Sequence, residues 1–194
     1  MALKSPHPKY SRFRFDAGSL ALNFVATVRH RGAEPRDLLT TPVALGEWFR
    51  LAGCQIPAVI TTQLELAEAL LLREAIYRTL RALILTATPD KDDVDRINAA
   101  AAFGLAVPQL NPASFHVRWE SADPPRARLA AVARDTVAVL CEAGRGRLKM
   151  CDNRGCQMLF IDHSPTNRRR WCAMSICGNR DKVRAHRRRV RSEE

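Results

Sequence analysis

Four of the six cysteines lie close together near the carboxyl end, in the pattern Cys151-x4-Cys156-x15-Cys172-x4-Cys177. Two close cysteine pairs separated by about 15–20 residues are typical of a structural zinc site. Each pair turns two sulfurs toward one point, and the connecting loop returns the second pair to complete a tetrahedron. Four thiolates fill the coordination sphere of zinc, so the pattern predicts one structural Zn²⁺ ion with no open position for catalysis.

Two other states of these cysteines remain open, namely two disulfides or four reduced thiols. Metal is favoured because the surrounding segment is basic and has few apolar residues to bury. Zinc binding in comparable peptides is worth about 10–16 kcal/mol and would supply the missing stability. Without metal we expect this segment to be largely unstructured. Its main apolar residues are Leu159, Phe160, Ile161 and Trp171.

The positive charge of the chain is concentrated in the same segment. The 194 residues contain 31 Lys and Arg against 20 Asp and Glu, a formal charge of +11. Residues 145–194 hold 14 of these basic residues and 5 of the acidic ones, so the preceding residues are close to balance. A concentrated positive charge favours polyanionic partners.

A basic helix is expected directly after the last cysteine. No helix breaker occurs from Gly178 to Arg191, and Arg184, Arg188 and Arg191 fall on one helical face. A short basic helix held by zinc is a common way to place guanidinium groups in a DNA groove or along phosphates. The candidate nucleic-acid-binding residues are Arg168, Arg169, Arg170, Arg180, Lys182, Arg184, Arg187, Arg188 and Arg191.

Several of these residues have an alternative interpretation. Arg180 is also a candidate partner for Asp162, a pair that would brace the metal site from outside. Asn179 is a candidate for the same supporting role or for a helix cap. The run 187–189 is also typical of a solvated tail or an RNA contact.

The first 144 residues predict a mainly helical domain. Capping signals and apolar periodicity predict helices beginning at Asp16 or Ser19 and running to about 29, and over 41–53, 62–86, 90–104 and 125–143. Alternation of apolar and polar residues predicts short strands at 12–15 and 114–120, which could pair as a small antiparallel sheet. The expected fold class is therefore α+β and predominantly α-helical. It comprises a domain over 1–144, a hinge at Gly144–Gly146 and a four-cysteine zinc finger over 145–194.

The sequence resembles a known family over nearly its whole length. The stretch Trp171–Arg180, with Cys177-Gly178-Asn179-Arg180, resembles the signature of CGNR zinc-finger proteins. The body resembles the ABATE domain that accompanies this finger, a family described as stress-induced transcription regulators. The family often reads LDFVNT where this chain has Asn23 and Ala26 in Leu22–Thr27. The other matching segments are 41–48, Leu72–Ile76 and the region of Asn98.

Together, the residues and the resemblance predict a zinc-dependent DNA-binding transcription regulator without enzymatic activity. The body is expected to sense a signal or to mediate homodimer formation, and the sequence does not identify an effector. Three other classes remain as alternatives: an RNA-binding module, a protein-interaction adaptor that uses zinc only structurally, and an enzyme with a pocket in the body. No apolar run approaches the length that spans a bilayer and no signal peptide is recognisable, so we expect a cytoplasmic protein without membrane contact.

Overall fold

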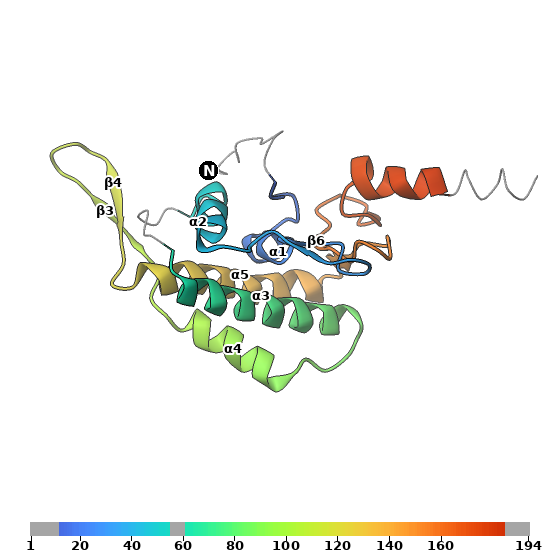
Figure 1. Cartoon of the computed structure of the whole chain (residues 1–194), viewed down its shortest axis with the longest axis horizontal. Helices are drawn as coiled ribbons and strands as arrows, with labels where there is room; N and C mark the ends of the chain where they lie inside the picture. Colours follow the sequence, from blue (N-terminus) through green and yellow to red (C-terminus); the bar gives the residue numbers. More distant parts are fainter. Residues whose placement is uncertain (1–11, 55–60, 185–194) are drawn as a thin grey trace, which may run out of the picture.

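The computed structural model describes residues 12–54 and 61–184, and helices dominate it (Figure 1). Three long helices, α3 (Gln63–Ile84), α4 (Lys91–Ala101) and α5 (Pro124–Gly144), pack on one another in pairs. The predicted class, α+β with a predominance of helix, is confirmed. Two shorter helices, α1 (Leu20–Val25) and α2 (Pro42–Leu51), pack against α3, and α1 also contacts α5.

The helices of the body begin at side chains that cap them. Thr41 and Thr62 accept hydrogen bonds from backbone N–H groups three residues later, at 3.2 and 3.1 Å. The Asp90 carboxylate accepts one from the N–H of Asp92 at 2.8 Å. Such caps satisfy N–H groups that have no partner within the helix. The predicted starts of α2, α3 and α4 are therefore confirmed.

The strands form three separate two-stranded ribbons. The strand expected within 114–120 is present as β4 (Val117–Glu120), but its predicted partner is wrong. It pairs with β3 (Val107–Leu110), and residues 12–15 form no strand. A hairpin between neighbouring segments closes a short loop, which costs less entropy than pairing with residues about 100 positions away. The β3–β4 hairpin projects from the end of the molecule opposite the cysteine-bearing segment (Figure 1).

A second hairpin replaces the end of the first expected helix. The chain leaves α1 at Val25, and β1 (Val28–Arg29) pairs with β2 (Arg36–Asp37). Arg73 of α3 holds this hairpin, because its guanidinium donates to both carboxylate oxygens of Asp37 at 2.8 and 2.7 Å. Burial raises the pKa of Asp37, but hydrogen bonds from Arg73 and from the N–H of Leu39, together with the positive charges of Arg73 and Arg31, outweigh it. This pKa therefore lies below its usual range.

The cysteine-bearing segment packs on the body. Its hairpin of β5 (Leu148–Met150) and β6 (Leu159–Ile161) contacts α1, α3 and α5. The side chains of β6 are buried in the same apolar cluster as Phe24 and Trp48 of the body. The N–H of Ile161 also donates to the carbonyl of Ala17 at 2.8 Å. The apolar residues of the finger are therefore buried mainly through contact with the body.

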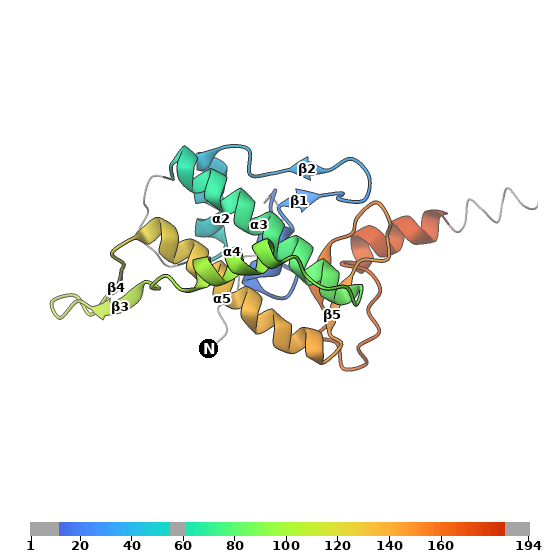
Figure 2. The same ribbon diagram turned by 90° about the horizontal axis from the view of Figure 1, so that it is seen from below.

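Two glycines permit the close approach between body and finger. A Cβ atom at Gly32, in the β1–β2 loop, would lie 1.8 Å from the carbonyl oxygen of Arg154. Gly18 has a φ of +101°, and a Cβ there would lie 3.0 Å from the Cβ of Ile161. Figure 2 shows the β1–β2 hairpin extending beside the finger. Within the described ranges, no helix is long and apolar enough to cross a membrane.

Candidate metal centre and adjoining basic surface

Three local structures position the four cysteines. Cys151 follows β5, and Cys156 closes the next turn, where its N–H donates to the carbonyl of Asn153 at 2.7 Å. Cys172 follows an irregular loop. Cys177 lies in η1 (Met174–Gly178), a single wide helical turn that continues into helical residues 179–184.

The four sulfur atoms have the spacing that zinc requires. All lie within 4.8 Å of one another. The Sγ of Cys172 is 3.7 Å from that of Cys156 and 3.6 Å from that of Cys177. A tetrahedral site with Zn–S bonds of about 2.3 Å has sulfur–sulfur edges of about 3.8 Å. The donor set and its spacing therefore fit one structural zinc ion.

The environment of the sulfurs also favours a bound cation. Hydrogen bonds with Cys151 and Cys156, together with the positive charge of Arg14, lower the pKa of the Cys172 thiol. Burial, followed by the negative charges of Cys172 and Cys151, raises the pKa of Cys177 to about 12. The negative charge of one thiolate therefore opposes ionisation of the next thiol. A cation bound between the four sulfurs would offset this repulsion and allow all of them to ionise.

A backbone N–H and an arginine side chain donate to sulfurs of the cluster. The N–H of Cys172 donates to the Sγ of Cys151 at 3.4 Å. Arg14, from the amino-terminal part of the body, donates to the Sγ of Cys172 at 3.3 Å and is oriented by Asp16 at 2.7 Å. Such contacts stabilise thiolates and orient metal ligands. The pattern of cysteines alone did not predict a contribution from Arg14.

Asp162 supports the site through partners other than the predicted one. It is fully buried, and its carboxylate accepts from Lys149 Nζ at 2.9 Å and from the N–H groups of Ser164 and Arg169 at 3.0 and 2.8 Å. Burial raises its pKa, but hydrogen bonds from Ser164 and Lys149 outweigh this and hold the pKa well below its usual range. The predicted pair with Arg180 is wrong, because Lys149 on β5 is adjacent and satisfies the carboxylate. Asp162 fixes the loop that leads to Cys172.

Comparison with protein families agrees with this geometry. A family model named ABATE, described as "Putative stress-induced transcription regulator", matches residues 18–143. The chain belongs to the ABATE family. A CGNR zinc-finger model matches residues 147–190 of this ABATE protein, so its four cysteines belong to a zinc finger of that type. No curated protein matches the chain.

The basic residues predicted to bind nucleic acid differ in their surroundings. Arg169 of the ABATE chain donates to the carbonyl of Trp171 at 2.9 Å and to that of Cys172, and stacks over the ring of Phe160. Its guanidinium therefore stabilises the finger. Arg170 pairs with Asp152 at 2.7 Å, and Arg168 is exposed.

The helix after Cys177 presents the remaining described basic residues to solvent. Arg180, Lys182 and Arg184 are all exposed. The side-chain amide of Asn179 donates to the carbonyl of Ser175 at 3.3 Å, and the start of η1 has no side-chain cap. The other three predicted contacts, Arg187, Arg188 and Arg191, lie outside the described residues.

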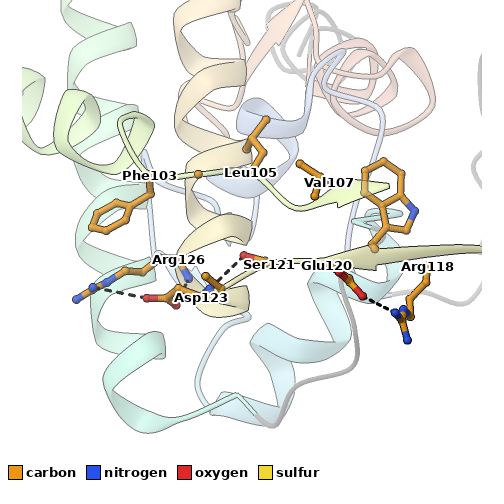
Figure 3. Close-up of a pocket in the computed structure, with 11 residues that line it drawn as sticks. Phe103, Leu105, Val107, Arg118, Glu120, Ser121, Asp123 and Arg126 are labelled. Atoms are coloured by element: carbon orange, nitrogen blue, oxygen red, sulfur yellow. Dashed lines mark hydrogen bonds and ion pairs between the residues drawn. The ribbon is translucent and has the colours of Figure 1, made fainter. Parts of the chain in front are cut away.

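A cleft of the ABATE domain lies at the base of the β3–β4 hairpin and encloses about 820 Å³ (Figure 3). Its charged groups are engaged with one another. Arg118 pairs with Glu120, while Asp123 caps α5 and pairs with Arg126. These charged groups therefore stabilise the hairpin and the start of α5.

Proposed function

We propose that this protein is a zinc-dependent DNA-binding transcription regulator in which the finger contacts DNA. The observation that supports the proposal is the continuity between the metal site and the exposed basic helix. Cys177 is buried in η1, and the chain continues from that turn into helical residues 179–184. A ligand at Cys177 would therefore fix the direction in which Arg180, Lys182 and Arg184 point.

Zinc dependence follows from the same connection. Backbone hydrogen bonds to the carbonyl of Ala173 form this turn, and the 3.6 Å contact between the Sγ atoms of Cys172 and Cys177 ties it to the other cysteines. Loss of the ion would leave like-charged or protonated sulfurs in place of a rigid tetrahedron. The basic helix would then lose its fixed orientation. In this proposal the body supports the finger and either senses a signal or mediates dimerisation.

The test is the salt dependence of binding to duplex DNA, measured by fluorescence anisotropy on the full-length zinc-loaded protein. Each phosphate contact that is lost reduces the slope of log K against log salt by about 0.9. The triple variant Arg180→Gln, Lys182→Gln, Arg184→Gln should therefore reduce the slope by about 2.7 and retain its zinc.

A matched control removes three positive charges elsewhere on the surface. Arg50, Arg81 and Arg96 are exposed and lie on α2, α3 and α4. Their replacement by Gln should leave the slope within experimental error of wild type. Equal slopes in both triple variants would contradict the proposal, and tighter binding to single-stranded RNA than to duplex DNA would favour the RNA-binding alternative.

A further inference from the structure

A second basic feature lies between the body and the finger, and the linear sequence does not reveal it. A pocket of about 380 Å³, here called the arginine pocket, is lined by basic groups from four separate segments and by no carboxylate. Apolar side chains of Val28, Leu38, Met158 and Ile176 form part of its wall. The basic residues are Arg12, Arg14, Arg29, His30, Arg36 and Arg180.

The positive charges of two of these arginines are already balanced by carboxylates. Arg12 pairs with Glu47 at 2.7 Å, and Arg14 pairs with Asp16 and also donates to the Sγ of Cys172. Arg29, Arg36 and Arg180 have no ion-pair partner within residues 12–54 and 61–184. Three guanidinium groups therefore line one space, and in the described part of the chain no carboxylate forms an ion pair with any of them.

Arg29 shows that this convergence is unfavourable without an anion. One of its terminal nitrogens donates to the carbonyl of Arg12 at 3.1 Å. Its Nε is buried and has no hydrogen-bond partner among the described residues. Burial and the nearby charge of Arg14 lower the pKa of Arg29, because both oppose its positive charge. A buried donor without a partner is unfavourable, and a bound acceptor would supply the missing hydrogen bond.

The zinc site offers an alternative reason for these charges. Cys156 and Cys177 line the pocket, and an ion held by four thiolates leaves excess negative charge. Among the described residues, however, the guanidinium that donates to a sulfur is that of Arg14. Arg36 belongs to β2, is exposed, and makes no hydrogen bond to a sulfur among the described residues.

We propose that the arginine pocket binds a phosphorylated small molecule of about nucleotide size. Guanidinium groups match the oxygens of phosphate with paired, charge-assisted hydrogen bonds. The volume lies within the usual range of small-molecule sites, about 300–1,000 Å³. The apolar wall suits the part of the ligand that carries no phosphate.

Occupancy of the pocket would affect the finger, an extension that rests on the proposed function. Arg180 lines the pocket and also lies on the exposed basic helix. A phosphorylated ligand and DNA therefore compete for the same guanidinium. The ligand should weaken DNA binding at constant ionic strength.

Isothermal titration calorimetry on the full-length zinc-loaded protein tests the site directly. The probes are ADP and pyrophosphate, with adenosine and sulfate as controls at matched ionic strength. ADP and pyrophosphate should bind with one site per chain, and adenosine and sulfate should bind at least about tenfold more weakly. Arg36→Gln should weaken ADP binding by about tenfold, the equivalent of one charge-assisted hydrogen bond. Arg50→Gln, a matched loss of an exposed charge on α2, should change it by less than about twofold.

Each other outcome overturns the proposal. These are no binding of ADP or pyrophosphate at about 1 mM, adenosine binding as tightly as ADP, or equal effects of Arg36→Gln and Arg50→Gln. Loss of zinc from Arg36→Gln, measured by atomic absorption, would assign the arginine to the metal site. Weakened DNA binding by Arg36→Gln without any ADP binding would assign the pocket to the DNA interface. The calorimetric titration contains no DNA. Its result therefore tests ligand binding in the arginine pocket separately from the proposed DNA binding.

Discussion

Replacement of Cys172 should destabilise the body of the protein as well as the finger. Cys172 is fully buried, and its sulfur contacts those of both Cys156 and Cys177. Serine supplies a harder, weaker ligand for zinc in its place, so Cys172→Ser should release the metal at neutral pH. The consequence for the body follows from how the finger is packed.

The magnitude follows from the side chains of β6. Leu159, Phe160 and Ile161 are 0%, 0% and 3% exposed, and all belong to the apolar cluster that includes α1, α2 and α3. Each such side chain contributes about 1.5–3 kcal/mol on burial, so separation of the finger removes about 6 kcal/mol from the free energy of unfolding. For a protein of this size about 1 kcal/mol shifts the Tm by about 2–4 °C. We therefore expect the Tm of Cys172→Ser to fall by about 15 °C.

Differential scanning calorimetry together with zinc analysis measures both effects. Cys141→Ser is the matched control, because Cys141 is exposed on α5 and lies outside the cluster of sulfurs. It should retain its zinc and melt within about 2 °C of wild type. If Cys172→Ser loses its zinc while the main transition stays within about 3 °C of wild type, zinc is not needed to keep β6 in the shared core, and the inferred coupling between metal and body is wrong.

Two further changes test how the β1–β2 hairpin is held. Gly32→Ala should lower the free energy of unfolding, measured in urea, by more than about 2 kcal/mol, because the new Cβ would collide with the backbone of Arg154. The control is Gly104→Ala, where a Cβ meets open space. This variant should be neutral or slightly stabilising. Asp37→Asn should lower the free energy of unfolding by about 2 kcal/mol at pH 7, because Arg73 is buried against this carboxylate. The lowered pKa of Asp37 means that its contribution is present above its unfolded-state pKa and is lost as the pH falls through the folded-state value. The difference between wild type and Asp37→Asn should therefore narrow from pH 7 to pH 3, and a constant difference over this range would contradict the assignment.

The sequence alone determined the metal site and most of the helices. Cysteine spacing predicts zinc ligands because short loops constrain where their sulfurs can meet, and the four sulfurs are indeed clustered. Thr41, Thr62 and Asp90 marked helix starts because a cap bonds to an N–H only two or three residues away. These interactions are local, so a linear pattern contains the information.

Only the tertiary structure decided which distant segments meet. It brings Arg14 to the sulfur of Cys172, 158 residues away. It also decided two partners at shorter range that the sequence pattern left open, β3 for β4 and Lys149 for Asp162. It also brings Arg12, Arg29, Arg36 and Arg180 to the arginine pocket. The physical reason is that side chains more than 100 residues apart come together through packing of the whole apolar core. Close approach at Gly18 and Gly32 then sets their final positions, and neither periodicity nor spacing encodes that approach.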